Sequence, residues 1–149
     1  MKRSERLNTL ARLAGSIERA ARTRLAHANQ DVSRKLNQEQ QLRDYESEYS
    51  NRWIASGRRG IEGTELQRIG AFRNSLQRAI STQEGVLAEA RTNAGHAAMF
   101  WSKQRNRLNT LEDLVERARG REYLEREKRL QREIDELAMR KRRTLDMTE

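Results

Sequence analysis

Apolar residues in two long stretches of the chain recur every third or fourth position, and the positions between them are mostly charged or polar. This spacing places the apolar side chains on one face of an α-helix, because a helix turns once in about 3.6 residues. The first stretch runs from about Ser4 to Ile54 and the second from Thr64 to about Arg143. The pattern therefore predicts two long helices.

Each predicted helix carries an apolar seam with heptad-like steps. The first seam contains one stutter, which would locally unwind a supercoil, and its many alanines bury little area each. Its members are Leu7, Leu10, Ala14, Ile17, Ala21, Leu25, Ala28, Val32 and Leu36. The second seam comprises Leu66, Ile69, Leu76, Ile80, Gln83, Leu87, Ala90, Ala94, Ala97, Trp101, Gln104, Leu108, Leu111, Val115 and Ala118.

The segment Ala55–Gly63 separates the two stretches and contains three glycines, which favour turns because glycine tolerates positive φ. Ser4 is the expected N-cap of the first helix. Thr64 and Gln67 have the spacing of a capping box at the start of the second. We therefore expect an all-α fold, a single antiparallel two-helix coiled-coil hairpin over residues 1–149, with helices at about 4–54 and 64–143 and a turn at 55–63.

The predicted second helix is longer than the first. Folding the chain about residue 59 places Leu42 opposite Leu76 and Leu7 opposite Leu111. Roughly 30 residues beyond Val115, or about 45 Å of helix, then have no partner. This segment, the overhang, keeps spaced apolar residues at Leu124, Leu130, Ile134, Leu137 and Leu145. It is either a surface for insertion into another protein or a frayed tail, since lone helices are marginally stable in water.

Composition agrees with extended helices rather than a compact globule. The chain has 149 residues and no proline, so nothing forces a helix to break. Its 35% apolar content is low for a globule but sufficient for a two-helix seam, which needs two apolar positions in about seven. Disorder is the rival interpretation of 36% charged residues, and the sustained periodicity argues against it.

Several features bear on location. No cysteine is present, which excludes disulfides and thiolate metal sites. No apolar run approaches the ~18 residues of a membrane-spanning helix. The basic start Met1–Arg6 is not followed by the apolar segment of a secretion signal. We expect a cytoplasmic protein.

The net charge of +9 is concentrated toward the ends of the sequence, where residues 1–24 carry seven Lys/Arg against two Asp/Glu and Arg140–Arg143 are all basic. Such charge favours acidic partners, although cations also stabilise helix C-termini or simply solvate a face. A nucleic-acid-binding coiled coil is an alternative. It is disfavoured because acids interleave with the bases, and steep salt dependence would distinguish it.

No arrangement of catalytic residues is evident. The two histidines, His27 and His96, have no carboxylate at ligand spacing. The glycine run lacks the Lys-Ser/Thr of a phosphate-binding loop. We expect no enzymatic activity, no cofactor and no bound metal.

Aromatic residues gather near the predicted turn, where four of the chain's seven occur: Tyr45, Tyr49, Trp53 and Phe72. Gln38, Leu42, Tyr45 and Tyr49 follow helical spacing on the first helix, as do Phe72, Leu76, Ala79 and Gln83 on the second. The two stripes lie side by side in the hairpin register. They form either an exposed aromatic patch typical of an interaction site or a staple that closes the hairpin.

The order of these motifs resembles the flagellar export protein FliJ family over essentially the whole chain. The residues that carry the resemblance are the opening series Ser4, Arg6, Leu7, Leu10, Leu13 and Ala14 with Glu18 and Ala21, the Tyr45/Tyr49 pair, the Phe72, Leu76 and Ala79 series, and the charged helix from Glu122 to Arg143.

The resemblance implies a stalk-like antiparallel coiled coil that binds a hexameric flagellar export ATPase and the export gate protein FlhA and recycles export chaperones. It implies a gate-binding surface at Gln38, Leu42, Tyr45, Tyr49, Phe72, Leu76, Ala79 and Gln83; the last position is often histidine in the family. It also implies that the helix ends bind the ATPase ring, through Leu7, Leu10, Ile17, Leu124, Leu130, Ile134 and Leu137.

The implied protein is a monomer, cytoplasmic and peripheral to the inner membrane at the export apparatus, with no nucleic-acid partner. Two alternatives stay open beside it. A stalk protein of an injectisome type III secretion system would have the same shape. A scaffold built as a homodimeric coiled coil is the structural rival, and the mass in solution would distinguish it from a hairpin.

Overall fold

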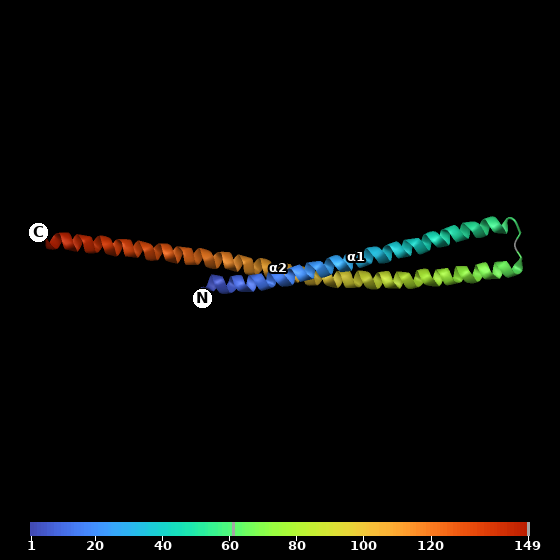
Figure 1. Cartoon of the computed structure of the whole chain (residues 1–149), viewed down its shortest axis with the longest axis horizontal. Helices are drawn as coiled ribbons and strands as arrows, with labels where there is room; N and C mark the ends of the chain where they lie inside the picture. The colour runs from blue at the N-terminus through green and yellow to red at the C-terminus, as the bar shows by residue number, and fades with distance from the viewer. Residues whose placement is uncertain (61, 149) are drawn as a thin grey trace. The chain divides into compact units, whose positions relative to one another are not determined.

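A computed structural model of the chain describes residues 1–60 and 62–148. Two helices account for nearly all of them, α1 (Arg3–Gly57) and α2 (Gly63–Met147), and the predicted all-α helical hairpin is confirmed (Figure 1). Helix α1 ends three residues later than Ile54, and α2 continues past Arg143. Ile61 of the predicted turn and Glu149 lie outside the described residues.

Both helices begin slightly before the residues predicted to cap them. The Lys2 carbonyl accepts from the amide of Arg6 at 3.2 Å, and the Glu62 carbonyl accepts from the amide of Leu66 at 3.1 Å. Lys2 and Glu62 therefore hold the N-cap positions, and Ser4 and Thr64 fall inside the first turns. The prediction assigned the caps by residue type, which leaves helix boundaries uncertain by one or two positions.

The connection between the helices uses the expected glycine chemistry at one position. Helix α1 tightens at its end, where the Arg59 amide donates to the Ser56 carbonyl at 3.0 Å. Gly60 follows with φ of 82°. This left-handed conformation suits glycine because it has no Cβ, and it lets the chain leave the α1 axis.

The chain forms two compact units, each described here by itself. The unit Arg19–Lys103 contains the second part of α1, the turn and the first part of α2. The two helix segments lie side by side and are joined by the turn (Figure 1). Their buried apolar residues are Ala21, Leu76, Ile80, Leu87, Ala90 and Ala94.

The other unit combines Met1–Glu18 with Gln104–Glu149. Its buried apolar residues are the small side chains Ala11, Ala14, Val115 and Ala118. Two polar residues, Ser4 and Glu18, are buried with them. Glu18 is only 1% exposed, and its carboxylate lies 3.7 Å from the guanidinium of Arg105. The seam of this unit is therefore thin and partly polar.

The predicted α1 seam is wrong at three residues. Leu10 is 50% exposed, Ile17 is 37% exposed and Leu36 is 45% exposed. Ala11 and Glu18 occupy the buried positions beside the first two. Periodicity favoured the larger apolar side chain of each neighbouring pair, whereas the structure buries the smaller Ala11 and the ion-paired Glu18. In the α2 seam only Leu66, 48% exposed, departs from the prediction.

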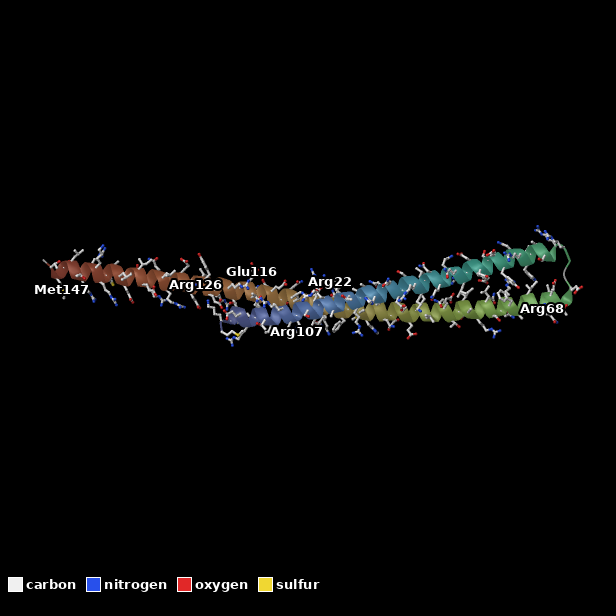
Figure 2. All side chains as sticks on the ribbon, viewed as in Figure 1. Arg22, Arg68, Arg107, Glu116, Arg126 and Met147 are labelled. Atoms are coloured by element: carbon white, nitrogen blue, oxygen red, sulfur yellow. The ribbon has the colours of Figure 1, made fainter. Side chains whose placement is uncertain are left out.

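The predicted register is also shifted. Ser4 contacts Glu122, two turns beyond the partner expected from a fold about residue 59. Part of the shift arises because the turn is centred near Gly60, and part because a long glutamate side chain reaches well past its own Cα. The overhang accordingly begins after Glu122 and comprises residues 123–147, all of them exposed. Figure 2 shows side chains projecting from α2 in all directions between Arg126 and Met147.

Candidate functional site

The residues expected to contact the export gate lie in the unit Arg19–Lys103, on the segments that flank the turn. We call this set the tip surface. It comprises Gln38, Leu42, Tyr45, Tyr49, Phe72, Leu76, Ala79 and Gln83. The structure brings two pairs of this set into contact across the helices and places the other members at different depths.

An aromatic pair forms the first contact. The ring centroids of Tyr49 and Phe72 are 4.5 Å apart, and the rings are tilted by 49°. Such a pair contributes about 0.5–1.5 kcal/mol beyond the area it buries. Tyr45, one turn before Tyr49, is 62% exposed. Tyr49 and Phe72 thus link the helices, while Tyr45 presents its ring to solvent.

A pair of amides forms the second contact. Gln83 Nε2 donates to Gln38 Oε1 at 3.1 Å and to the Lys35 carbonyl at 3.2 Å. Both amide hydrogens of Gln83 are therefore used in bridging α2 to α1. Gln83 acts here as a cross-helix bridge, and Gln38 is the exposed partner of the pair.

Two leucines of the set belong to the packed seam rather than to the accessible surface. Leu76 is 8% exposed, and Leu42 is half-buried. The exposed members are Gln38, Tyr45, Phe72 and Ala79. The tip surface is therefore a narrow strip of aromatic and amide groups above a leucine seam.

An ion-pair group beside this strip was not predicted. Arg43 contacts Glu84 across the helices at 2.6 Å and Glu39 on its own helix at 2.8 Å. The hydrogen bond to Glu39 is the main reason that the pKa of the Arg43 guanidinium lies above its usual value. Arg43 and Glu84 are each about half exposed, so water screens their attraction. Helical spacing does not reveal a cross-helix pair of this kind.

Trp53 completes the aromatic group near the turn. Its side chain is half-buried, and the Arg73 guanidinium carbon lies 5.7 Å from the ring centroid. This is a cation–π distance. The Trp53 Nε1 atom is buried and has no hydrogen-bond partner among residues 1–60 and 62–148. Arg73 thus lies over the indole ring of Trp53.

The residues expected to dock into an ATPase ring lie in the other unit and are mostly exposed. On α1, Leu10 and Ile17 flank Leu13, which is 60% exposed and escaped the prediction, while Leu7 is half-buried. On the overhang the exposed members are Leu124 at 59%, Leu130 at 47%, Ile134 at 58% and Leu137 at 64%. We call these seven predicted residues the ring-docking residues. The overhang leucines form an apolar surface that nothing in the described chain covers.

The start of α1 is held to α2 by a contact that sequence reasoning also missed. Glu122 accepts from the Ser4 hydroxyl at 2.7 Å and from the Ser4 amide at 3.1 Å. A carboxylate at a helix N-terminus is favourable because it satisfies unpaired amides and faces the positive end of the helix dipole. The Ser4 hydroxyl and amide, followed by the charges of Lys2 and Arg126, hold the pKa of Glu122 below its usual value.

The helical hairpin presents exposed aromatic side chains, a residue type that is enriched at protein–protein interfaces. The comparison with known families is specific: the model of the flagellar FliJ protein family matches residues 2–144. The chain belongs to this family. Searches of curated proteins and of solved structures returned no significant match.

Membership of the FliJ family makes the chain a stalk-type component of flagellar type III protein export, a system in which it interacts with other export proteins. The family is one of non-enzymatic components. None of the helices in the described part of the chain combines the length and apolar character needed to cross a membrane.

Proposed function

We propose that the protein is the stalk of the flagellar export apparatus, coupling the hexameric export ATPase to the export gate protein FlhA and recycling export chaperones. It works in the cytoplasm, peripherally at the inner membrane, as a monomer without enzymatic activity of its own. The family match over residues 2–144 carries this proposal. The tip surface and the ring-docking residues are the binding sites that we propose for this role.

The tip surface supports binding to the gate. Tyr45 and Phe72 offer exposed aromatic area, and aromatic anchors dominate many protein interfaces. Tyr49, Leu76 and Gln83 have mainly a supporting role, because they pack or bond between the helices. Tyr45 is therefore the residue whose removal separates binding from folding most cleanly.

Substitution of Tyr45 tests the proposed binding of the tip surface to the gate. Tyr45→Ala should weaken binding of the soluble gate domain by roughly thirtyfold, since truncating an aromatic anchor commonly costs about 2 kcal/mol. The melting temperature should change little because the ring is 62% exposed. Tyr123, 61% exposed in the other unit, is the matched control. Equal gate affinity for both variants and the unchanged protein, measured by calorimetry, would remove Tyr45 from the site.

The ring-docking residues support binding to the ATPase. Leu130, Ile134 and Leu137 recur at four- and three-residue steps, so they share one face of the overhang. Each is between 47% and 64% exposed. A face of this kind gains stability when a partner removes it from water, at about 25 cal/mol per Å² of apolar surface.

Replacing these three residues by alanine keeps the helix, because alanine has the highest helix propensity, and removes the apolar face. We expect the triple variant to lose stimulation of ATP hydrolysis by the export ATPase, as deletion of residues 124–149 should. Leu66→Ala, at a residue 48% exposed near the turn, is the control. Undiminished stimulation by the triple variant would show that the ring contacts another surface.

A further inference from the structure

A groove of about 520 Å³ lies between the start of α1 and the part of α2 from Leu114 to Arg129. Both segments belong to the unit that combines Met1–Glu18 with Gln104–Glu149. Its floor includes Leu114 and Ala118. Six cations line it: Lys2, Arg3, Arg117, Arg121, Arg126 and Arg129. Two carboxylates, Glu122 and Glu125, also line it, which leaves a net of four positive charges. We call this the basic groove.

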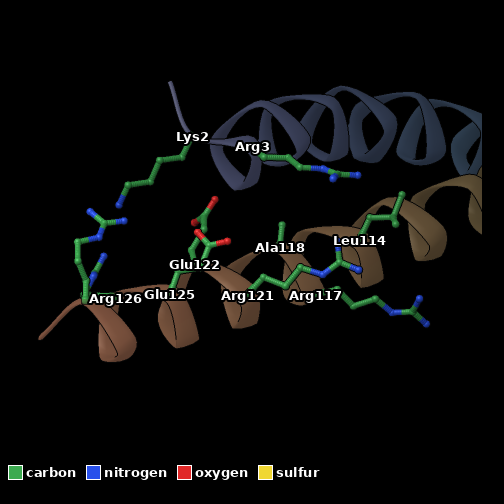
Figure 3. Close-up of a pocket in the computed structure, with 10 residues that line it drawn as sticks. Lys2, Arg3, Leu114, Arg117, Ala118, Arg121, Glu122, Glu125 and Arg126 are labelled. Atoms are coloured by element: carbon green, nitrogen blue, oxygen red, sulfur yellow. The ribbon is translucent and has the colours of Figure 1, made fainter. Parts of the chain in front are cut away.

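Most of these cations make no ion pair, although Lys2 and Arg126 act electrostatically on Glu122. Among the residues that the structure describes, Arg117 pairs with Asp113 at 3.0 Å, and the other five cations have no ion pair. Figure 3 shows the side chain of Lys2, just before α1, extending toward the side of the groove where Arg126 of α2 lies. Unpaired like charges in a concave site attract an anion, because the walls focus their field.

Most of the groove residues of α2 lie on a different flank from Leu130, Ile134 and Leu137. Leu114, Ala118, Arg121, Glu125 and Arg129 follow three- and four-residue steps and share one flank of α2. Viewed along the axis of α2, these residues lie to one side of Glu122. Leu130, Ile134 and Leu137 lie to its other side, rotated by roughly a quarter turn about the axis. Two ring-docking residues border the groove, because Leu130 follows Arg126 by one turn and Leu124 follows Arg121 by three residues.

The placement of charge within the groove selects the kind of ligand. Arg117 and Arg129 are about 18 Å apart along α2, at 1.5 Å per residue. One phosphate group cannot reach both. Between them, Glu122 and Glu125 point from α2 into the space toward α1 (Figure 3). Ser4 already binds Glu122, but its charge and that of Glu125 oppose a continuous row of phosphates.

We propose that the basic groove binds an acidic segment of a partner protein, which places carboxylates at the two ends of the groove and a neutral or basic side chain opposite Glu122 and Glu125. The apolar floor at Leu114 and Ala118 fits the aliphatic part of such a segment. None of the tip-surface or ring-docking residues lines the groove, and the test below uses neither the export gate nor the ATPase.

The probe is a fluorescein-labelled synthetic helical peptide with glutamates near both ends and glutamine at its centre, titrated with the full chain and followed by anisotropy. The groove variant is Arg121→Ala with Arg129→Ala. The control is Arg140→Ala with Arg143→Ala, which removes the same charge from the end of α2, outside the groove. Alanine preserves the helix in both variants, and circular dichroism verifies this.

We expect the groove variant to bind the peptide roughly tenfold or more weakly, because each arginine makes a charge-assisted hydrogen bond. The control should bind like the unchanged chain. Equal losses in both variants would show diffuse attraction by the net charge and would overturn the proposal. Displacement of the peptide by inorganic triphosphate at a lower concentration than by unlabelled peptide would assign the groove to phosphate ligands instead.

A second variant tests the proposed position of the acidic side chains. Glu125→Gln removes a central carboxylate that faces the ligand. It should raise affinity for a peptide with glutamates throughout and leave affinity for the end-acidic peptide nearly unchanged. If the unchanged chain already binds both peptides equally, or if Glu125→Gln alters neither, the charge pattern assigned to the partner is wrong.

Discussion

At the scale of single residues, the contact between Ser4 and Glu122 is the most informative feature that the pattern of apolar positions concealed. Ser4 has the residue type of an N-cap, yet it lies within the first turn, and the carboxylate of another helix accepts its amide. One carboxylate thereby satisfies the start of α1 and fixes which part of α2 lies beside it. The electrostatic consequence is a lowered pKa for Glu122.

This lowered pKa makes a pH-dependent prediction. A carboxyl group whose pKa is lower in the folded state contributes stability above its ordinary value of 4.5, and the contribution is lost as pH falls through the folded-state pKa. Glu122→Gln should therefore lower the melting temperature at neutral pH, and its difference from the unchanged chain should disappear in strong acid. Thermal unfolding followed by circular dichroism measures both. Glu133→Gln, on the exposed overhang, is the control and should leave the melting temperature at neutral pH unchanged.

Gly60 supports a second prediction at this scale. Its φ of 82° is costly for residues with a Cβ, so Gly60→Ala should lower the free energy of unfolding by about 1 kcal/mol. Gly57 lies in α1, has no such φ, and has open space where a Cβ would lie. Gly57→Ala should instead stabilise by about 0.4–1 kcal/mol. Urea unfolding of both variants provides the comparison, and equal shifts would refute the role of the left-handed residue.

At the scale of the helices, the two seams differ in how far the sequence predicts them. From Leu76 to Ala118 the α2 seam is apolar at nearly every step, so periodicity identifies it. The α1 seam passes through Ala11 and Glu18. Periodicity predicted the neighbouring Leu10 and Ile17 instead, because they are the larger apolar side chains. The burial of Glu18 depends on partners from elsewhere in the chain, which periodicity does not contain.

Register is a second property of the helices that periodicity leaves open. Sliding one helix by a heptad keeps apolar positions opposite apolar positions, so the pattern permits several registers. Side-chain contacts such as Gln83 with Gln38 and Ser4 with Glu122 distinguish them. For the same reason the sequence placed the tip aromatics together but did not separate the exposed Tyr45 from the packed Tyr49, and it did not reveal the basic groove.

The corrected α1 seam is testable by a pair of substitutions. Ala14 is 5% exposed where the helices approach closely, so Ala14→Leu should destabilise by about 1–3 kcal/mol through overpacking. Leu10 is 50% exposed, so Leu10→Ala should change stability by no more than about 0.5 kcal/mol. Chemical unfolding gives both values. A large loss for Leu10→Ala with a small one for Ala14→Leu would restore the seam predicted from periodicity.

At the scale of the whole molecule, the question is whether α1 and α2 of one chain pair with each other or with a second copy. Both arrangements bury the same seam positions. The glycine turn and the cross-helix pair of Arg43 with Glu84 favour pairing within one chain. A net charge of +9 also opposes association of identical chains.

The absence of cysteine allows spin labels to be placed at chosen positions without removing native thiols. Labels on Arg43→Cys and Glu84→Cys replace a pair whose side-chain atoms are 2.6 Å apart and about half exposed. A monomeric hairpin should show strong dipolar coupling that persists when the labelled chain is diluted with unlabelled chain, and sedimentation equilibrium should give a mass near 17.5 kDa. Singly labelled chains should show no coupling. Coupling that fades with dilution, together with twice the mass, would instead establish a coiled coil between two chains.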